Sequence, residues 1–426
     1  MKVAVMGYGT IGSGVVEVLE VNREIIKERV GEPLEVKKVL DLREFEGDPI
    51  AEKIVHDYKE IVNDDEISMV VETMGGVEPA YTFVKEMLTA GKHVTTSNKA
   101  LVADKGAELI KIAREHKVNF MFEASVGGGI PIIRPLLTCL TGDVIEEISG
   151  IVNGTTNYMM TKMSAEGSEY EDVLKEAQAL GYAEKDPTAD VEGIDAARKI
   201  AVLASLAFNT PLTLKDVHVE GIDNIEACDI EYARDLGYVV KLLGVAKNDP
   251  ENGITANVYP VMLPKNHPLA SVNDVYNAIY VNGDAVGDAM FMGRGAGRMP
   301  TASAVCSDII DISRNILFNA CGRVNSNLFE KKKMCPPEKE MANCYFRLLV
   351  TDRPGVLAAI ASTFAAQQMS IASVIQKNVM DNGTAELVII TNKVSKLSLD
   401  LSLRTLQVLP VVKKVCSVLR VEDPSL

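Results

Sequence analysis

The chain has 426 residues, 47% of them hydrophobic and 24% charged, so it is long enough for two to four domains with substantial cores. Its formal net charge of −15 argues against nucleic acid or an anionic membrane as a partner, because both would require a basic face. No run of about 20 apolar residues predicts a membrane-spanning helix, and the seven scattered cysteines fit a reducing cytoplasm without a zinc framework.

The first 130 residues alternate between short apolar runs, typical of buried strands, and amphipathic patterns, typical of helices. Strand patterns occur in "KVAVM", "LEVKKVLD", "SMVVETMGG", "HVTTSN" and "NFMFEAS", and helix patterns in "PAYTFVKEMLTAGK" and "GAELIKIAREH". Such alternation predicts a parallel sheet that is covered by helices on both faces. We therefore expect an α/β protein that opens with a Rossmann-like, doubly wound nucleotide-binding domain over residues 1–130.

The turn after the first strand, "GYGTIGSG", has the Gly-x-Gly-x-x-Gly spacing. Gly7 permits a tight turn, Gly9 lets a pyrophosphate approach the backbone, and Gly12 lets helix and strand pack closely. The helix that follows offers free N–H groups and a partial positive charge to the phosphates. The motif predicts dinucleotide binding by Gly7, Gly9, Thr10, Ile11 and Gly12, with a purely structural turn as the alternative.

The residue that ends the second strand bears on the type of nicotinamide cofactor. Asp41 is placed to accept hydrogen bonds from a ribose 2′-hydroxyl and to repel a 2′-phosphate. Arg43, Lys37 and Lys38 lie nearby in the sequence and could compensate that repulsion. The pattern favours NAD slightly over NADP.

From about residue 131 the strand patterns become longer and partly alternating, as expected of an antiparallel sheet. They occur in "EISGIVN", "TANVYPVMLP", "NAIYVNG" and "AMFMGRG", and the helix patterns "YEDVLKEAQALG" and "GIDAARKIAVLASLAF" interrupt them. We expect an α+β domain for substrate binding or dimerisation over residues 131–329. Residues 295–320 of it are expected to pack back on the nucleotide domain.

Residues 330–342, "EKKKMCPPEKEMA", are charged, contain Pro-Pro and lack apolar periodicity, which predicts a linker. The patterns that follow over residues 343–422 have the order strand, helix, strand, strand, helix, strand. This βαββαβ order predicts a ferredoxin-like domain.

One stretch, "GYAEKDPTADVEGIDAARK", gathers acidic side chains ahead of Lys199. Asp195 and Lys199 are four residues apart on a predicted helix and share one face, while Glu184 and Asp190 lie in the loop before it, which contains Pro187. Alcohol oxidation needs a group that takes the hydroxyl proton, and a lysine can do so if burial lowers its pKa to roughly 7–8. The carboxylates could grip a substrate ammonium. The alternative is a surface Asp–Lys pair that stabilises the helix by about 0.3–0.5 kcal/mol.

Two other dehydrogenase patterns are poorly supported. Tyr-x-x-x-Lys, the catalytic pair of short-chain dehydrogenases, occurs at Tyr81/Lys85 and Tyr158/Lys162. About one such pair is expected by chance, and the glycine turn has the wrong spacing for that family, so packing explains both pairs better. The histidines and cysteines have no ligand spacing, which excludes zinc alcohol-dehydrogenase chemistry.

Six motifs occur in one order along the chain: "GYGTIGSG", "TTSNKALVA", "FEASVGGGIPII", "GIVNGTTNYMMTKM", "LGYAEKDPTADVEGIDAARK" and "GRGAGRMPTASAV". With them the chain resembles the homoserine dehydrogenase family over nearly its whole length. The resemblance implies an NAD(P)-dependent interconversion of L-homoserine and L-aspartate 4-semialdehyde. The reductive direction would serve threonine and methionine synthesis, in the cytoplasm.

The resemblance also implies roles for the residues of the acidic stretch. Lys199 would be the general acid/base, and Glu184 and Asp195 would bind L-homoserine, chiefly its amino group, with support from Asp190. Lys99 in "SNKA" would reach both the nicotinamide and the substrate, the alternative being a solvated lysine at a helix start.

Further cofactor contacts follow from the same resemblance. Thr73 and Ser97 end strands at the crevice where such sheets bind ligands. Gly297 in "GRGAG" would let the backbone approach the cofactor, the alternative being a glycine hairpin turn. Many family members that prefer NADP have an arginine where this chain has Leu40, a difference that favours NAD or dual use.

The segment "EASVGGGIP" resembles one that holds a monovalent cation, usually sodium, through main-chain carbonyls. The matching positions are Glu123, Val126, Gly128 and Ile130. A hard cation suits oxygen ligands, although the glycines are also compatible with a simple turn.

The C-terminal unit resembles an ACT domain, a module that binds amino acids in biosynthetic enzymes. "VTDRPGVLAAIASTFAAQQMSIASVIQ" carries the likeness, and Pro354 and Gly355 open a helix whose N-terminus can receive a ligand carboxylate. Such domains usually pair and bind the effector between them, which implies a homodimer or homotetramer. Threonine, the end product of the pathway, is the expected effector. A pure oligomerisation module is the alternative.

Two other classes of function stay open. One is an oxidoreductase that uses the same cofactor on another amino or hydroxy acid, which should not share the spacing of Glu184, Asp195 and Lys199. The other is a catalytically silent amino-acid sensor, which would bind threonine without turnover.

Overall fold

The computed structural model describes residues 1–322, 330–376, 379–380 and 383–422, so the predicted domain boundary at residue 329 lies outside the described residues. The chain divides into two compact units, each of which is built from three segments. Unit 1 comprises Met1–Ile148, Arg198–Val217 and Asn277–Lys331, and unit 2 comprises Ser149–Ala197, His218–Tyr276 and Lys332–Leu426.

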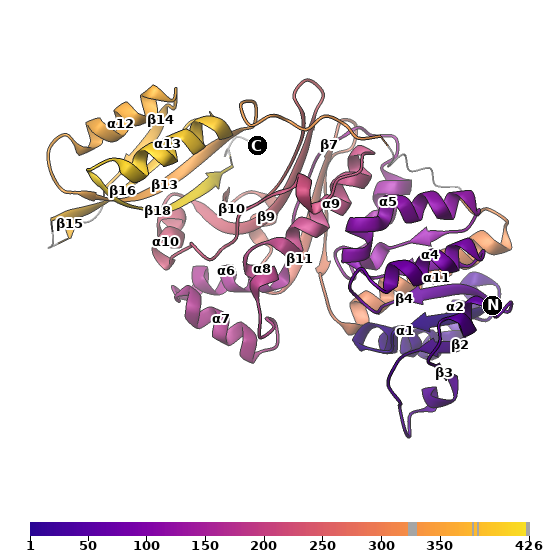
Figure 1. The fold of residues 1–426 in the computed structure, drawn as a ribbon. Coiled ribbons are helices and arrows are strands. Elements are labelled where there is room, and N and C mark those ends of the chain that lie inside the picture. The colour runs from indigo at the N-terminus through magenta and orange to yellow at the C-terminus, as the bar shows by residue number, and fades with distance from the viewer. Residues whose placement is uncertain (323–329, 377–378, 381–382, 423–426) are drawn as a thin grey trace. The chain divides into compact units, whose positions relative to one another are not determined.

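Unit 1 contains a six-stranded sheet with the order β3-β2-β1-β4-β5-β6, in which all neighbouring strands are parallel (Figure 1). Its strands are β1 (Lys2–Met6), β2 (Glu35–Leu40), β3 (Ile54–Val55), β4 (Ile67–Glu72), β5 (His93–Thr96) and β6 (Phe120–Met121). Alternate residues of β1 enter different cores: Val3 and Val5 pack on one face, and Ala4 and Met6 on the other. Burial on both faces explains the unbroken apolar runs and confirms the doubly wound domain.

Helices cover both faces of this sheet. One face carries α1 (Thr10–Val21), α2 (Arg23–Val30) and α11 (Arg298–Leu317), and the other carries α3 (Lys59–Val62), α4 (Ala80–Thr89) and α5 (Lys99–Glu115). The helix α11 comes from a distant part of the chain and packs closely on α1, since a Cβ on Gly14 would lie 3.1 Å from Cβ of Ala302. Short 3-10 or π turns are η1 (Pro49–Lys53), η2 (Glu123–Ser125), η3 (Pro135–Cys139) and η4 (Leu214–Asp216).

Some elements of unit 1 differ from the prediction. The elements α2, β3 and α3 were not predicted, because they are short and carry weak periodicity. The helix α5 begins at Lys99 rather than at residue 106, because the Asn98 side chain caps it by accepting a hydrogen bond from the N–H of Leu101 at 3.1 Å.

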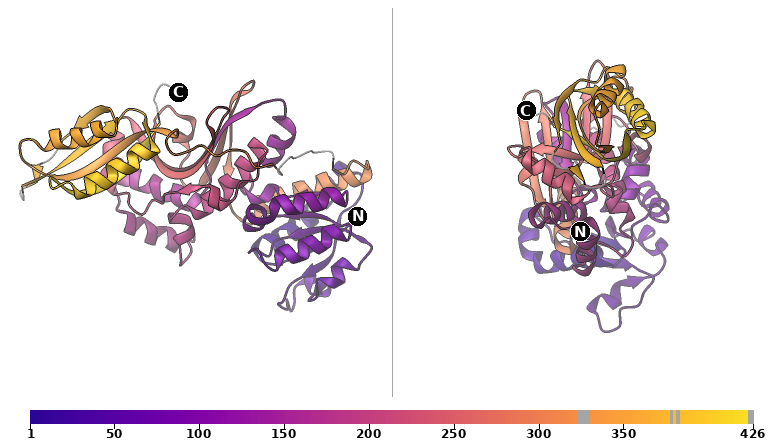
Figure 2. Two further views of the ribbon diagram at one scale, coloured as in Figure 1. Left: turned by 45° about the horizontal axis from the view of Figure 1, so that its top comes forward. Right: turned by 90° about the vertical axis from the view of Figure 1, so that its left-hand side faces the viewer.

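Unit 2 contains the strand order β9-β10-β18-β13-β16-β14. The strands are β9 (Tyr238–Asp249), β10 (Gly253–Pro264), β13 (Met341–Thr351), β14 (Ile371–Ile375), β16 (Thr384–Thr391) and β18 (Val412–Val421). With α12 (Val356–Ala366) and α13 (Lys396–Val408), the last four of these strands form the predicted βαββαβ domain, whose helices lie along one sheet (Figure 2). This arrangement confirms the ferredoxin-like fold.

The C-terminal domain is hydrogen-bonded directly to the strand β10. Val261 and Met262 of β10 pair in parallel with Arg420 and Val421 of β18. The predicted linker also lies along β10, where Ile254 donates to the carbonyl of Lys333 at 2.9 Å and accepts from Cys335 at 2.8 Å. Residues 330–340 contain no helix, and β13 already begins at Met341.

Most of the other elements lie in the middle of the chain, and two short strands belong to the C-terminal region. In unit 2 they are α6 (Gly154–Glu166), α7 (Tyr170–Ala179), α8 (Thr188–Val191), α10 (Ala227–Asp235), β8 (His218–Val219), η5 (Pro268–Ser271), β15 (Val379–Met380) and β17 (Val394–Ser395). The strand β12 (Gly287–Arg294) belongs to unit 1, while β7 (Ile145–Ile151), α9 (Ile194–Phe208) and β11 (Tyr276–Gly283) have residues in both units. Among the described helices, none combines the length and apolarity needed to cross a membrane.

Candidate active site

The glycine turn between β1 and α1 has the geometry that its spacing predicts. Gly7 has φ +97°, a conformation that favours glycine, and a Cβ on Gly12 would lie only 1.9 Å from the carbonyl oxygen of Gly7. At Gly9, in contrast, a Cβ would meet nothing within 4 Å, and no side chain caps the N-terminus of α1 at Thr10. The turn therefore leaves open the position where a phosphate group would approach the backbone.

Thr73, just after β4, braces this turn, and Glu72 links the ends of β4 and β5. The hydroxyl of Thr73 donates to the carbonyl oxygen of Gly7 at 2.9 Å. The buried carboxylate of Glu72 accepts from the N–H of Met74 at 2.7 Å and from the hydroxyl of Thr96, and burial raises the pKa of Glu72. Sequence reasoning missed Glu72 because the dinucleotide-binding pattern gives a role to an acid at the end of the second strand, Asp41, and none to an acid at the end of β4.

Asn98, two residues after Thr96, directly precedes the lysine that the resemblance singled out. Asn98 Nδ2 donates to the carbonyl oxygen of Gly76 at 2.6 Å, while its Oδ1 caps α5. Ser97 and Lys99 flank Asn98, so both are held at the carboxyl end of the sheet. Lys99 is the first residue of α5 and is partly buried.

Asp41, the acid predicted to bind the cofactor ribose, already accepts hydrogen bonds from other residues of the chain. Asp41 accepts from the N–H of Tyr8 at 2.8 Å and from two side-chain nitrogens of Arg43 at 2.9 and 3.0 Å. The hydrogen bonds from Arg43 hold the pKa of the Asp41 carboxyl well below its usual range. Lys37 and Lys38 pair instead with carboxylates such as Asp64. Of the three nearby cations, Arg43 is the one that lies beside Asp41.

Two of the predicted substrate acids converge on a residue that the prediction gave no role. Nδ2 of Asn153 donates to Asp190 Oδ1 at 2.7 Å and to Asp195 Oδ2 at 2.9 Å. Asp190 lies on the single-turn helix α8, not in a loop as predicted, because a proline is tolerated just before a helix begins. Asn153 precedes the helix α6, and this capping position was the available signal for it.

The predicted catalytic lysine lies on α9, one turn after Asp195. The exposed fractions are 3% for Asp195 and 8% for Lys199, so these side chains do not form the exposed surface pair that was the alternative. Gly193, with φ +80°, makes the turn into α9, where a Cβ would lie 3.0 Å from Val258 Cγ1. Glu184 differs from the other acids because it lies on an exposed turn, where Gln178 donates to its main-chain oxygen.

Two glycine-rich segments that are far apart in the sequence meet in unit 1. The N–H of Gly129 donates to the carbonyl oxygen of Arg294 at 3.1 Å, and a Cβ on Gly128 would lie 2.5 Å from the carbonyl oxygen of Gly295. Asn277 packs against Gly295, and its Oδ1 is the buried side-chain oxygen without a hydrogen-bond partner among the described residues. The turn that contains Val126, Gly128 and Ile130 therefore lies beside the carbonyl oxygens of Arg294 and Gly295.

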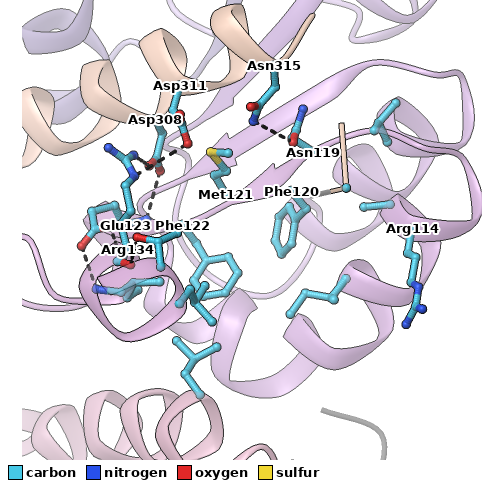
Figure 3. A pocket seen from close by; sticks show the side chains of 18 residues that line it. Arg114, Asn119, Phe120, Met121, Phe122, Glu123, Arg134, Asp308, Asp311 and Asn315 are labelled. Atoms are coloured by element: carbon cyan, nitrogen blue, oxygen red, sulfur yellow. Dashed lines mark hydrogen bonds and ion pairs between the residues drawn. The ribbon is translucent and has the colours of Figure 1, made fainter. Parts of the chain in front are cut away.

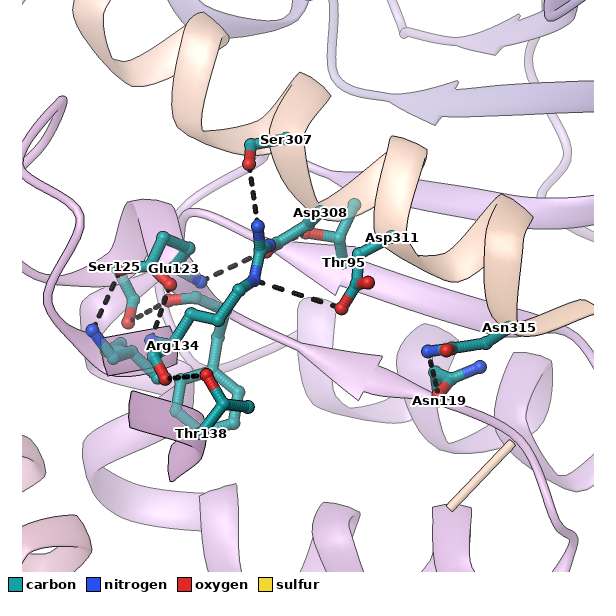
Figure 4. A network of polar contacts seen from close by, with 12 residues as sticks. Thr95, Asn119, Glu123, Ser125, Arg134, Thr138, Ser307, Asp308, Asp311 and Asn315 are labelled. Carbon is teal, nitrogen blue, oxygen red and sulfur yellow. Dashed lines mark hydrogen bonds and ion pairs between the residues drawn. The ribbon is translucent and has the colours of Figure 1, made fainter. Parts of the chain in front are cut away.

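The carboxylate of Glu123, the first residue of that segment, binds the backbone further along the chain. Its oxygens accept from the N–H groups of Ile132, Ile133 and Arg134 at 2.7 to 2.8 Å. The Arg134 guanidinium then reaches α11, where it donates to Asp308 at 2.7 Å (Figure 4). A cation at this segment could therefore use the main-chain carbonyl of Glu123 but not its side chain, while no cluster of three His, Cys, Asp or Glu suited to a metal occurs among the described residues.

A cavity of about 220 Å³ lies along the edge strand β6, which β4 and β5 separate from β1 (Figure 3). Phe120 and Phe122 form part of its apolar wall, and Arg134, Asp308 and Asp311 form part of its polar wall. The residues predicted to bind the dinucleotide do not line it. The cavity is therefore distinct from the glycine turn.

Both Tyr-x-x-x-Lys pairs form hydrogen bonds or ion pairs with carboxylates of a neighbouring helix, a contact that the packing interpretation did not specify. Tyr81 and Lys85 both donate to Glu108 on α5. Tyr158 and Lys162 pair likewise with Glu176 on α7, at 2.7 and 3.1 Å. All seven cysteines lie in the described part of the chain, and each is a free thiol.

Comparison with known families matches almost the whole length of the chain. The family model for the homoserine dehydrogenase NAD-binding domain matches residues 7–123, that for homoserine dehydrogenase matches residues 131–310, and that for the ACT domain matches residues 345–411.

Individual relatives agree with these models. A homoserine dehydrogenase from Bacillus subtilis is 42% identical over 99% of this chain and 98% of its own. The crystal structure of one from Thiobacillus denitrificans superposes with a TM-score of 0.93 at 38% identity, covering 99% of this chain and 98% of its own. A hyperthermophilic archaeal homoserine dehydrogenase in complex with NADPH has a TM-score of 0.63 at 28% identity, over 73% of this chain and 97% of its own. This chain therefore belongs to the homoserine dehydrogenase family.

Proposed function

We propose that this chain catalyses the NAD(P)-dependent interconversion of L-homoserine and L-aspartate 4-semialdehyde, with Lys199 as the general acid/base. One observation carries the proposal: Asp190 and Asp195 converge on one amide nitrogen, and the buried Lys199 follows one turn later on α9. The acids supply negative charge for an amino-acid ammonium, and the lysine supplies a group that can move a proton.

In the oxidative direction Lys199 would accept the proton of the C4 hydroxyl and return it to solvent. The nicotinamide, when bound, supplies the acceptor for the C4 hydride. Asp190 and Asp195, with Glu184, would bind the ammonium and so hold C4 in place. In the reductive direction Lys199 would give its proton to the carbonyl oxygen, and this direction would serve threonine and methionine synthesis.

The residues of unit 1 fit a nicotinamide dinucleotide because the glycine turn is open at Gly9. Gly7, Gly9, Thr10, Ile11 and Gly12 would contact the pyrophosphate, Asp41 the ribose, and Thr73, Ser97, Lys99 and Gly297 the nicotinamide half. Since Arg43 neutralises Asp41 at short distance, a 2′-phosphate is not excluded by charge, and we expect both NAD and NADP to be accepted.

A monovalent cation, sodium in the first instance, would bind to the main-chain carbonyls of Glu123, Val126, Gly128 and Ile130. The partnerless oxygen of Asn277 supports this proposal, because oxygen atoms are the ligands that a hard cation prefers. We expect the enzyme activity to increase when sodium replaces a large organic cation in the buffer, and a rate measurement in the two buffers tests this.

The ACT domain would bind threonine as a feedback effector and would pair in a homodimer or homotetramer. Gly355, at φ +91°, precedes α12, and no side chain caps this helix, which leaves its first N–H groups for a ligand carboxylate. Addition of threonine to the enzyme should lower the rate if this assignment is right.

The experiment that tests the proposed function follows NAD(P)H absorbance with L-homoserine at alkaline pH, with sodium or potassium as the cation. Lys199→Ala should lose at least about a hundredfold in kcat, whereas Lys85→Ala, a change on the surface of α4, should retain the wild-type rate. No turnover by wild type with either cofactor would contradict the assignment and favour the amino-acid sensor. An active Lys199→Ala variant would move the proton-transfer role to Lys99.

A further inference from the structure

The Asn153 side chain both caps a helix and donates hydrogen bonds to two acids. As the residue before α6, it accepts at Oδ1 from the N–H of Thr156 at 2.9 Å and from the Thr156 hydroxyl at 3.0 Å. Because Oδ1 is used as an acceptor twice, the orientation of the amide is defined, and the NH₂ group must face the opposite way. The side chain is 6% exposed, so water has little access to it.

The NH₂ group of Asn153 joins carboxylates from two different helices. Its two hydrogens match its two acceptors, Asp190 of α8 at 2.7 Å and Asp195 of α9 at 2.9 Å. Two carboxylates that share one donor nitrogen repel each other, and the shared donor offsets part of that repulsion. No other uncharged side chain of this size both accepts at a helix start and donates two hydrogen bonds.

The helix that carries Asn153 is itself held in place one turn later. Asn157 Nδ2 donates to the carbonyl oxygens of Asp274 and Tyr276, each at 3.0 Å. Lys241 of β9, whose pKa burial lowers to about 8, donates to Asn157 Oδ1 at 3.0 Å. The two asparagines of the "NGTTNY" motif therefore connect α6 to α8 and α9 through Asn153 and to β9 and residues 274–276 through Asn157, and these bonds restrict the position of Asn153.

We propose that Asn153 is a positioning residue, whose amide sets the separation of Asp190 and Asp195 and so determines the affinity for the substrate ammonium. It acts through these two acids and not by transferring a proton. The inference rests on the proposed function, because it assumes that the acids receive an amino-acid substrate.

The variant Asn153→Asp tests this role with the least change in shape. Aspartate is as good as asparagine at a helix start, so α6 keeps its cap, but both donors are replaced by a third carboxylate. The titratable groups around the new carboxylate are Asp190, Asp195, Lys199 one turn along α9, and Lys241 on the far side of Asn157. Three close carboxylates would retain one proton, and the protonated acid would donate one hydrogen bond as the pH falls.

The measurement is kcat and KM for L-homoserine and for the nucleotide from pH 6.5 to pH 9, with thermal unfolding as the check on folding. For Asn153→Asp, the KM for L-homoserine should rise at least about tenfold at pH 9 while the KM for the nucleotide stays within about twofold. The rise should shrink towards pH 6.5. Asn153→Ser, which keeps a cap but offers one short donor, should also raise the KM, by the same factor at every pH.

Two results would overturn the inference: an unchanged KM for L-homoserine in a folded Asn153→Asp variant, or a rise that is the same at every pH. Either would reduce Asn153 to a helix cap. If Asn153→Asp does not fold, an unchanged KM in Asn153→Ser overturns it equally. Failure of the proposed function is distinct, because wild type itself would then not turn over L-homoserine.

Discussion

Two buried networks, one in each unit, are built around an arginine and differ in how far the arginine itself is buried. In unit 1, Arg134 retains 31% exposure of its side chain, and it donates to the buried Asp308. In unit 2, Arg347 of β13 is exposed by only 3%, and its partner Asp229 of α10 is fully buried. The arginine of unit 1 can be hydrated, whereas that of unit 2 depends on its carboxylates.

The two networks differ in how the charge of the buried groups is stabilised. Arg347 gives Nε and Nη2 to the two oxygens of Asp229, at 2.7 and 3.0 Å, and Nη1 to Glu386 at 2.9 Å. Burial opposes the charge on Arg347, but the hydrogen bonds with Asp229 and Glu386 and the charge of Asp229 together contribute to a raised pKa of Arg347. Around Arg134, burial and the neighbouring Glu123 raise the pKa of Asp308 to about 7. An acid in a low-dielectric site can thus adapt by taking up a proton, whereas a bidentate arginine pair cannot.

The comparison predicts its largest effect for loss of the buried arginine. Arg347→Met should lower the free energy of unfolding by about 3–5 kcal/mol, because it leaves Asp229 charged and buried. Arg134→Met should cost less at pH 6, since Asp308 can then be neutral. Urea unfolding of both variants measures the difference between the two losses of stability. Faster hydrogen exchange of the β13 amides should show the loss in Arg347→Met.

A second substitution controls for lost packing. Adding Asp229→Asn to Arg347→Met removes the uncompensated charge and should recover part of the stability. If the double variant is no more stable than the single one, charge burial is not the cause of the loss.

The next effect is the pH dependence of Asp308. Its folded-state pKa of about 7 lies above its ordinary value of 3.8, so between these values the folded state binds the extra proton. The contribution of Asp308 to the free energy of unfolding should therefore fall as the pH rises from 4 to 7, by on the order of 3 kcal/mol. Thermal unfolding of wild type and Asp308→Asn over this range should show the difference, and parallel curves would contradict it.

A histidine in the same unit should show the opposite pH dependence. His93 Nδ1 accepts from the N–H of Asn119 at 3.0 Å, and burial lowers the pKa of His93 to about 4. Since the unfolded chain binds a proton near pH 6.5, stability is complete above that pH and is lost as the pH falls towards 4. Relative to His93→Asn, which keeps an acceptor, wild type should lose about 2 kcal/mol between pH 7.5 and pH 5. Equal losses in both proteins would contradict the assignment.

The smallest effect is expected where both partners are exposed. Lys85 and Glu108 pair at 3.2 Å with 46% and 44% of their side chains exposed. Water already solvates these charges, so Lys85→Ala should shift the midpoint of thermal unfolding by no more than about 1 °C. A larger shift would show that Lys85 contributes through packing on Tyr81.

Much of the fold follows from local patterns in the sequence. The alternation of strands and helices, the glycine turn and the βαββαβ order were all predicted, because periodicity and turn chemistry act over a few residues. The same holds for Asp195 and Lys199, whose four-residue spacing places them on one face of α9.

Other features depend on segments that are distant in the sequence. The sequence suggested a linker before the ACT domain, but only the tertiary structure pairs β18 with β10. The sequence also predicted that the main-chain carbonyl of Glu123 binds a cation. The tertiary structure adds that the Glu123 carboxylate accepts from three N–H groups of residues 132–134.

The sequence by itself determined which residues are available for chemistry: the glycines of the turn, the acids before and at the start of α9, and Lys199. Only the tertiary structure decided which of them meet. Asn153 is 37 residues from Asp190 and 42 from Asp195, and its amide reaches both. The physical reason is that a hydrogen bond between distant residues depends on the packing of whole helices, which no local pattern of residues encodes.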